Sequence, residues 1–276
     1  MPSLIDTSTG PVAYDETGTP GSAPPLFLLP SGAHDRHDFD ELRRLLPAGR
    51  HTFALDWPSH GDSPPGVGAL SAMRCAEIAE EVIAKLAPEG AIVLGNSVGG
   101  FAAARVAIRR PELVRGLVIV DGGGFGGRSP LTRAVCALMA RPRFLRAVYP
   151  AFSAAYMRAR TPADARARQT AIATTRADPG LAAIAGLWRS FASREHDLRR
   201  EAPAITAPTL LIWGRRDPVI PRRIGRRIQR LIPGSQLVLL DTGHVPHTSE
   251  PGAVAAELLA FAGTVAGAPA ERAAAA

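Results

Sequence analysis

Residues 92–100 read I-V-L-G-N-S-V-G-G, and they carry the most specific chemical signal in this chain. A short apolar run precedes the pattern G-x-S-x-G and helical spacing follows it, which is the setting in which a serine occupies a sharp strand-to-helix turn. Gly95 and Gly99 lack the Cβ atoms that would clash in such a turn, and the N-terminus of the following helix favours developing negative charge. The stretch therefore predicts that Ser97 is a nucleophile.

A serine hydroxyl is a weak nucleophile unless a base activates it and an acid orients that base. Both residue types follow strand-like runs farther along the chain. Asp217 comes after T-L-L-I-W, and His244 comes after Q-L-V-L-L. Ligands bind at the edge of an open sheet where the parallel strands have their carboxyl ends, so we expect Ser97, Asp217 and His244 to meet there. Together they predict a catalytic triad.

Apolar runs of strand length alternate with helical spacing on both sides of this stretch. We expect strands over 12–15, 26–29, 52–56, 91–94, 117–120, 209–213 and 236–240. We expect helices over 39–46, 72–86, 98–108 and 253–261. The alternation indicates right-handed crossovers, so the predicted fold class is α/β, with a mostly parallel central sheet flanked by helices.

The alternation stops between residues 128 and 203, where no strand pattern occurs. Helical stretches follow one another there, with a proline near the expected start of each one: Pro130, Pro142, Pro162 and Pro179. We therefore expect a core made of residues 1–127 and 204–276, with an all-helical insertion over 128–203.

The charge balance raises the question of a nucleic-acid partner. The chain has 32 Lys and Arg residues against 25 Asp and Glu, a formal net charge of +7. However, Lys85 is the only lysine and the arginines are scattered, which favours a compositional bias. The densest arginine group, within 222–230, lies on one face of a predicted helix whose other face carries Ile224 and Ile228, as in a solvated helix. We expect a small-molecule substrate and no nucleic-acid partner.

Composition excludes several other classes. At 276 residues and 46% hydrophobic, the chain can bury a large core, but no apolar run approaches the roughly 20 residues that span a bilayer. We expect no membrane association and, because no basic segment precedes an apolar one at the N-terminus, no signal peptide. Cys75 and Cys136 lie among apolar residues, which favours buried free thiols and a cytoplasmic setting.

No pattern points to a cofactor or a metal. The sequence contains no H-E-x-x-H, no cluster of aspartates and no phosphate-binding glycine loop ahead of a helix. We therefore expect neither group, while the oligomeric state stays open.

Taken together, these segments resemble the α/β-hydrolase superfamily from about Val12 to Phe261. Four stretches carry the likeness besides the serine turn: L-F-L-L-P-S-G (26–32), A-L-D-W-P-S-H-G-D-S (54–63), W-G-R-R-D-P-V-I-P (213–221) and G-H-V-P-H-T-S-E-P (243–251). The order Ser, Asp, His is also that of this superfamily. The resemblance implies that the helical insertion is a cap over the active site. It also implies an oxyanion hole made by the backbone N–H groups of Val98 and Ala33.

The chain departs from the family pattern in the loop after residues 26–29. Ser31-Gly32 replaces the usual His-Gly, and the loop continues into His34. We name His34, together with Trp188 of the insertion, as the candidate substrate-binding residues, with the alternative that His34 only hydrogen-bonds within the loop. Two rival assignments also stay open: Asp121, which ends another strand, as the acid, and His247 as the base. The settings of Asp217 and His244 match the family better.

The resemblance implies a small, largely apolar ester or thioester as substrate. Haloalkane dehalogenases and epoxide hydrolases of this superfamily use an aspartate nucleophile, so Ser97 disfavours both reactions. Six aromatic residues of the insertion either line an acyl pocket or pack the cap onto the core, and we expect packing for most of them: Phe144, Tyr149, Phe152, Tyr156, Trp188 and Phe191.

Three different functions stay open beside the ester hydrolase. The turn G-N-S-x-G-G and the pair Trp188-Arg189 also resemble carbon–carbon bond hydrolases, although the tryptophan usual after the catalytic histidine is absent. The unusual S-G-A-H loop at 31–34 motivates a lyase or cyclase of secondary metabolism on the same scaffold. A ligand-binding protein with vestigial catalysis is the third, and the complete set of Ser97, Asp217 and His244 argues against it.

Overall fold

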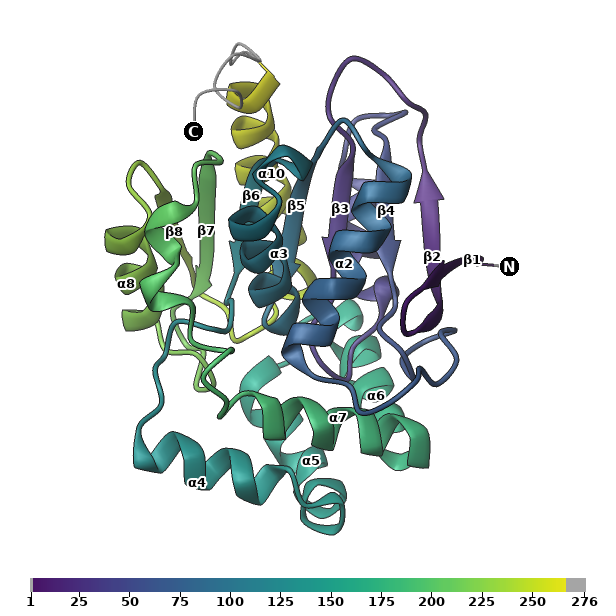
Figure 1. The fold of residues 1–276 in the computed structure, drawn as a ribbon, viewed down its shortest axis with the longest axis vertical. Helices are drawn as coiled ribbons and strands as arrows, with labels where there is room; N and C mark the ends of the chain where they lie inside the picture. Colours follow the sequence, from purple (N-terminus) through teal and green to yellow (C-terminus); the bar gives the residue numbers. More distant parts are fainter. Residues whose placement is uncertain (1, 267–276) are drawn as a thin grey trace.

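The computed structural model describes residues 2–266, which are built around one eight-stranded sheet (Figure 1). The strands are β1 (Ser3–Thr7), β2 (Gly10–Thr17), β3 (Leu26–Leu29), β4 (Thr52–Leu55), β5 (Ala91–Asn96), β6 (Val114–Val120), β7 (Thr209–Gly214) and β8 (Gln236–Leu240). Their order across the sheet is β1-β2-β4-β3-β5-β6-β7-β8. The first two pairings, β1 with β2 and β2 with β4, are antiparallel, and all others are parallel. The predicted α/β class with a mostly parallel sheet is confirmed.

Every predicted strand is present, and one strand was missed. The bounds of β3 and β8 agree with the prediction at both ends. The missed strand, β1, has the burial pattern of an edge strand, with three of its five residues exposed. Its five residues pair with β2 from Ser3 opposite Tyr14 to Thr7 opposite Gly10, so a long-range ladder stabilises it rather than a local apolar pattern.

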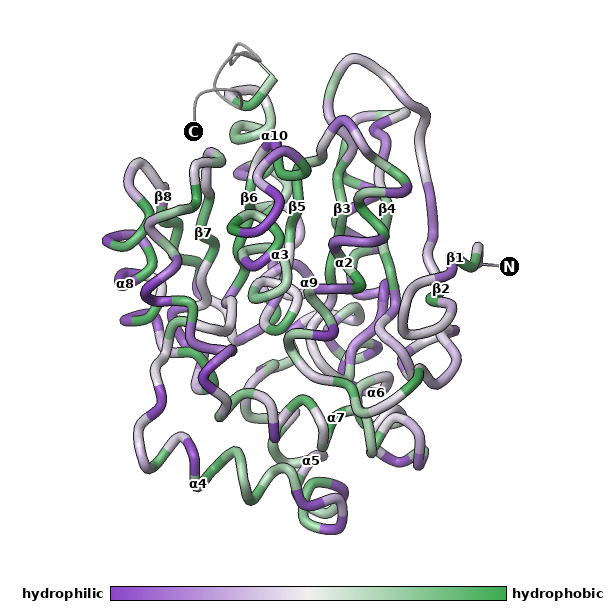
Figure 2. Tube along the Cα trace, viewed as in Figure 1, coloured by the Kyte–Doolittle hydropathy of each residue, from purple (hydrophilic) through white to green (hydrophobic). Residues whose placement is uncertain are grey.

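Helices cover both faces of the sheet. The helices of the core are α1 (Asp40–Arg44), α2 (Ala72–Leu86), α3 (Val98–Arg109), α8 (Arg223–Leu231), α9 (Pro246–Ser249) and α10 (Pro251–Ala266), with a 3₁₀ helix η1 over Arg36–Phe39. One buried cluster joins α2, α3 and α8 to the sheet, and a second joins α1 and α10 to the opposite face. Figure 1 shows α2 and α3 in front of the strands and α10 behind them. The central strands β3 and β5 are hydrophobic along their length because helices bury both faces (Figure 2).

Four α-helices, two short 3₁₀ helices and no strand lie between β6 and β7, a segment that the structure describes throughout. The α-helices are α4 (Pro130–Met139), α5 (Pro142–Met157), α6 (Pro162–Arg176) and α7 (Asp178–Ser190). Proline is the first residue of three of them and the second residue of α7, where the missing N–H costs no intrahelical bond. The helices lie together at one end of the sheet, at the bottom of Figure 1.

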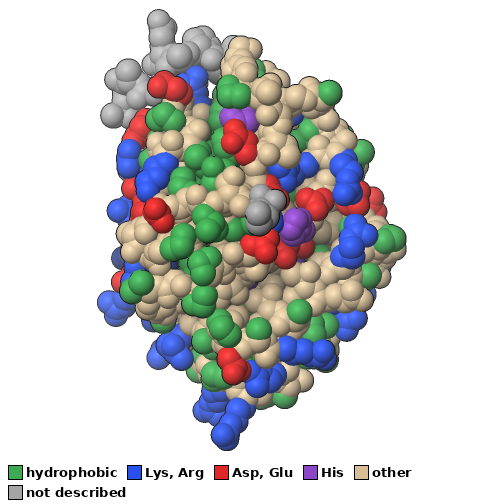
Figure 3. All heavy atoms as spheres, turned by 90° about the vertical axis from the view of Figure 1, so that its right-hand side faces the viewer, with side chains coloured by type: hydrophobic (Ala, Val, Ile, Leu, Met, Phe, Trp, Pro, Cys, Tyr) green, Lys and Arg blue, Asp and Glu red, His purple; other side chains and the backbone are tan. Residues whose placement is uncertain are grey.

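The basic side chains of the described residues are scattered on the face shown in Figure 3 and form no single patch there. On the face seen in Figure 3, blue side chains lie at several separate places around the rim and at the lower end, whereas red ones gather near the middle. On α8, Ile224 and Ile228 are buried while Arg223, Arg226 and Arg230 are exposed, which is the arrangement predicted for this helix. Cys75 and Cys136 are both buried and unpaired.

Within residues 2–266, no helix combines the length and the apolar character needed to cross a bilayer.

Candidate active site

Ser97 lies on a strained turn between β5 and α3. Its backbone has φ 56° and ψ −112°, a region that residues with a side chain rarely adopt. A Cβ atom on Gly95 would lie 2.1 Å from the carbonyl oxygen of Gly99, and one on Gly99 would lie 2.2 Å from that of Leu29. Both positions therefore require glycine, which is the steric reason for the G-x-S-x-G pattern. The turn leaves Ser97 half-buried at the N-terminus of α3.

His244 is held on three sides. Its Nδ1 lies 2.7 Å from Asp217 Oδ2, its backbone N–H donates to the Tyr156 carbonyl at 2.9 Å, and its own carbonyl accepts from Asn96 Nδ2 at 3.0 Å. Asp217 Oδ1 in turn accepts from the N–H groups of Val219 at 2.7 Å and Ile220 at 3.1 Å. A carboxylate on Nδ1 places the imidazole proton there, so Nε2 carries the lone pair that a general base needs.

The serine turn and the histidine loop meet at one cavity. Ser97 and His244 both line a space of about 250 Å³ that also contacts Gly32 and Val98. Among residues 2–266, no hydrogen bond joins Ser97 Oγ to His244 Nε2. A catalytic hydrogen bond often forms only when substrate fills the site, so the shared cavity is compatible with a pairing of Ser97 and His244.

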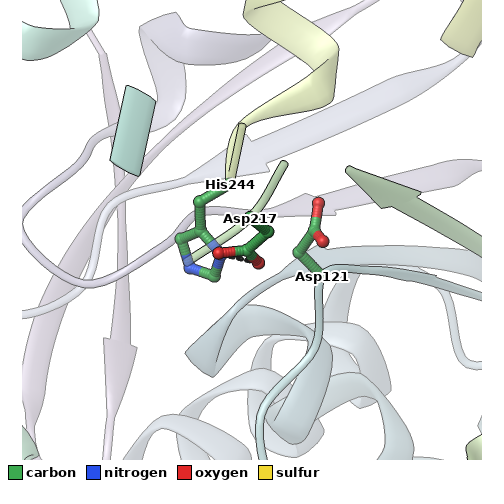
Figure 4. Close-up of side chains that lie close together, drawn as sticks. All are labelled: Asp121, Asp217 and His244. Carbon is green, nitrogen blue, oxygen red and sulfur yellow. Dashed lines mark hydrogen bonds and ion pairs between the residues drawn. The ribbon is translucent and has the colours of Figure 1, made fainter. Parts of the chain in front are cut away.

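Asp121 lies beside the His244–Asp217 pair, as Figure 4 shows. Each of these three residues offers a potential ligand atom within 4.8 Å of the others. Both carboxylate oxygens of Asp121 face the N–H of Gly214, at 3.0 and 3.2 Å. Burial, with the charge of Asp217 and a hydrogen bond to it, raises the pKa of Asp121 well above its usual value. Burial and the neighbouring Asp217 thus favour the protonated form of Asp121, and the observed bond to His244 belongs to Asp217.

The structure changes the expected oxyanion donors. Ala33 is fully buried and its N–H donates to His60 Nε2 at 3.0 Å, so this group is already used. Burial lowers the pKa of His60 to about 4, which keeps its Nε2 an acceptor, while His60 Nδ1 bonds the Pro58 carbonyl at 2.9 Å. Ala33 is therefore not supported as a donor. Gly32, one residue earlier, lines the cavity with Val98.

His34 does not line the cavity, contrary to the prediction that it binds substrate. It has no exposed surface and is hydrogen-bonded at both ring nitrogens, to Asp38 Oδ2 at 2.6 Å and to the Tyr156 hydroxyl at 2.7 Å. His34 itself thus reaches the cavity only through the hydroxyl of Tyr156 on α5, whereas Ser31 and Gly32 of the same loop line the cavity directly. Trp188, the other predicted substrate contact, does line the cavity.

Most of the insertion's aromatic residues do more than pack. Five of the six named from the sequence line the cavity: Tyr149, Phe152, Tyr156, Trp188 and Phe191. Phe152 also contacts Trp188 edge-to-face with ring centroids 5.8 Å apart, so these side chains pack the insertion and bound the cavity at once. Only Phe144 packs against the core without reaching the cavity.

Two residues of the site carried no usable signal in the sequence. Asn96 hydrogen-bonds both the Val120 and the His244 carbonyls at 3.0 Å, which ties the serine turn to the histidine loop. His196 lines the cavity between the rings of Phe101 and Phe191. Both contacts join segments far apart in the chain, so local patterns could not indicate them.

His247, the rival base, is buried against Phe39 with ring centroids 4.6 Å apart and is not among the residues that line the cavity. Neither ring nitrogen has a hydrogen-bond partner among the described residues, and burial lowers the pKa of His247 to about 4. It is a packed core side chain.

Replacing His247 with phenylalanine is expected to flatten the acid side of the stability profile. An unfolded histidine takes up a proton near pH 6.5, whereas the buried one does so only near pH 4, so His247 costs stability as the pH falls between these values. The free energy of unfolding of the variant minus that of the wild type should increase by about 1.4 kcal/mol for each unit by which the pH falls in this window. Thermal unfolding of both proteins at pH 7, 6 and 5 measures this. A constant difference between them would contradict the assignment.

Known proteins resemble this chain over most of its length. A model of the alpha/beta hydrolase family matches residues 26–257. The chain is 32% identical over 245 residues to a pimeloyl-[acyl-carrier protein] methyl ester esterase of Klebsiella pneumoniae, covering 86% of this chain and 92% of that protein. The corresponding esterase of Neisseria meningitidis is 29% identical over 256 residues, covering 86% of this chain and 76% of that protein.

Solved structures show the same fold. A hydrolase from Pseudomonas aeruginosa PA01 superposes with a TM-score of 0.80 at 26% identity, covering 95% of this chain and 98% of that one. The enol-lactonase from Burkholderia xenovorans LB400 has a TM-score of 0.77 at 22% identity, covering 94% and 99% of the two chains. At that lower identity the likeness concerns the fold alone.

Proposed function

The chain belongs to the alpha/beta hydrolase family, and from that premise we propose that it is a serine esterase acting on a small, largely apolar ester or thioester. The observation that most supports this is the strained Ser97 turn, which shares one cavity with a histidine bonded to Asp217 at 2.7 Å. The esterase names of the relatives favour an ester over a carbon–carbon bond.

In the proposed mechanism, His244 Nε2 takes the Ser97 proton while Ser97 Oγ attacks the ester carbonyl. Asp217 keeps the Nδ1 proton in place and stabilises the imidazolium that forms. The N–H groups of Val98 and Gly32 bind the tetrahedral oxyanion, and each such donor is worth about 10² to 10³ in rate. His244 then protonates the departing alcohol or thiol, and water cleaves the acyl-enzyme by the same route.

We also propose that residues 128–203 act as a cap on a core of residues 1–127 and 204–276, of which residues 1 and 267–276 lie outside the described part of the chain. Helices α5 and α7 support this role because they supply the aromatic side chains of the cavity. The Tyr156 carbonyl, which holds the His244 N–H, comes from α5 as well. The cap therefore contributes to the alignment of the base and not only to the shape of the pocket.

A series of p-nitrophenyl esters of increasing acyl length tests the proposal. Because the cavity is about 250 Å³ and apolar side chains dominate it, we expect kcat/KM to be highest for acyl chains of about four to six carbons and to fall for long chains. A fluorophosphonate probe should label Ser97. Absence of turnover for the whole series, together with absence of labelling, would refute an esterase.

A further inference from the structure

A second acid–histidine pair lies behind the wall of the cavity, and its hydrogen bonds lead to two tyrosines that line the cavity instead of to a serine. Asp38 Oδ2 lies 2.6 Å from His34 Nδ1, His34 Nε2 lies 2.7 Å from the Tyr156 hydroxyl, and that hydroxyl lies 3.1 Å from the Tyr149 hydroxyl. The four side chains are at most 6% exposed. The proposed ester chemistry uses none of these side-chain groups, although both tyrosines line the same cavity as Ser97.

The chain of hydrogen bonds has one open end. Both ring nitrogens of His34 are hydrogen-bonded, to Asp38 and to Tyr156, and the Tyr156 hydroxyl is hydrogen-bonded to His34 and to Tyr149. Within residues 2–266, Tyr156 is the sole hydrogen-bond partner of the Tyr149 hydroxyl. A buried hydroxyl can both donate and accept, so Tyr149 retains one hydrogen-bonding position that the protein does not fill. Because Tyr149 lines the cavity, a bound ligand is the available partner.

We propose that Tyr149 and Tyr156 form a polar subsite that donates a hydrogen bond to an oxygen substituent on the acyl chain of the substrate. The preferred substrate class is then an ester whose acyl chain carries a keto group, not a purely aliphatic one. Asp38 and His34 act as positioning residues for the two hydroxyls. The inference rests on the proposed esterase function for the placement of the ester group.

Proton counting determines which way this chain of hydrogen bonds runs. When His34 carries two ring protons, Nδ1–H donates to Asp38 and Nε2–H donates to Tyr156, so the Tyr156 proton goes to Tyr149 and the Tyr149 proton points to the ligand. When His34 is neutral, Nδ1–H still donates to Asp38, but Nε2 accepts from the Tyr156 hydroxyl, Tyr156 accepts from Tyr149, and Tyr149 can only accept from a ligand. Burial raises the pKa of both tyrosines, so both keep their protons in either case.

The surroundings favour the doubly protonated form of His34. Burial lowers the pKa of His34, but the ion pair and hydrogen bond with Asp38, with a smaller effect of Asp35, raise it to a net value above 6.5. Three other charged or titratable groups act on this cluster: His60 and His247 through His34, and Arg168 through Tyr156. The first two are neutral because burial lowers the pKa of each to about 4.

Methyl pentanoate and methyl 4-oxopentanoate differ by one keto oxygen and test the subsite. After division by their uncatalysed alkaline rates, we expect wild-type kcat/KM to favour the keto ester by about tenfold or more, the value of one hydrogen bond to a buried partner. This preference should fall as the pH rises through the titration of His34. The two esters share the same triad, so other titrations cancel in the ratio.

The matched variants are Tyr149→Phe and Tyr14→Phe. Each removes one hydroxyl, but Tyr14 lies on β2 away from the cavity, with its ring 6.2 Å from that of Phe53. Tyr149→Phe should bring the ratio close to one, and Tyr14→Phe should leave it unchanged. A general loss of packing would slow both esters alike and keep the ratio. A ratio near one in the wild type, or a ratio retained in Tyr149→Phe, would overturn the subsite.

Binding of the same two esters to Ser97→Ala protein, followed by calorimetry, separates the subsite from the esterase reaction. If the wild type hydrolyses methyl pentanoate but binding and turnover show no preference, the subsite is wrong and the esterase stands. If neither ester is hydrolysed while the keto ester binds more tightly and Tyr149→Phe removes the difference, the subsite stands and the esterase is wrong.

Discussion

Replacing Ser97 with alanine is expected to lower kcat for p-nitrophenyl butanoate by about 10⁴ to 10⁶. The variant lacks the oxygen that forms the acyl-enzyme, and only binding and the oxyanion donors remain to accelerate attack by water. His244→Ala should cost a similar factor, and the double variant little more, because residues of a triad act as a unit. Steady-state kinetics on purified variants measures the loss. Alanine is a suitable replacement on this strained turn because it keeps the Cβ atom of serine and removes only the hydroxyl.

Ser31→Ala is the matched control for this loss. Ser31 also lines the cavity, but it lies in the loop after β3 and lacks the strained turn and the glycines of Ser97. Its replacement should change kcat by less than about tenfold, since it forms no covalent bond. Fluorophosphonate labelling should disappear in Ser97→Ala and persist in Ser31→Ala. The opposite result would make Ser31 the nucleophile.

Replacing Asp217 with asparagine is expected to lower kcat by about 10³ to 10⁴. An asparagine amide donates a hydrogen bond where the carboxylate accepted one, so His244 Nδ1 loses its proton acceptor at 2.7 Å and the imidazole adopts the other tautomer. The base lone pair then faces position 217 instead of Ser97. Kinetics with the butanoate ester measures the loss, and circular dichroism checks that the fold is kept.

Asp121→Asn tests the alternative acid and should keep activity within about tenfold. Asparagine can still accept from the Gly214 N–H and donate to Asp217, as the neutral acid does. If Asp121→Asn removed activity while Asp217→Asn left it within tenfold, the acid would be Asp121.

The same variant should also change how the stability of the protein depends on pH, because Asp121 is buried. The pKa of Asp121 is raised well above 3.8, so above pH 4 the folded protein keeps a proton that the unfolded chain releases. The contribution of Asp121 to the free energy of unfolding therefore falls as the pH rises from 4 toward the raised pKa. Asparagine has no such proton, so the melting temperature of Asp121→Asn should rise relative to that of the wild type as the pH rises from 4 toward the raised pKa.

Several features could be predicted from the sequence because their causes are local. The bounds of β3, α2 and β8 follow from apolar runs and helical spacing, and they agree with the structure. The four helices of the insertion begin at or one residue before a proline, since proline costs nothing in the first helical turn. The serine turn was equally local, because a Cβ at Gly95 would lie 2.1 Å from the Gly99 carbonyl.

The residue-level errors lie where the chain folds back on itself. Ala33 was expected to face the oxyanion, but His60, 27 residues away, accepts its N–H. His34 was expected at the substrate, but Tyr156, 122 residues away, covers it. In both cases the side chain or amide was placed in the correct region, and a partner from another segment took its hydrogen bond.

The sequence alone was sufficient for the α/β class and for the order along the chain of every strand except β1, because apolar periodicity specifies these, and it nominated the three residues that we propose carry the chemistry. Only the tertiary structure determined which hydrogen bonds those residues make, which amides remain available to an oxyanion, and that a buried Asp38–His34 pair ends on two tyrosines of the cavity. Such contacts depend on which buried polar groups meet when distant segments pack. A buried donor or acceptor must find a partner wherever the fold supplies one, and a local pattern does not contain that information.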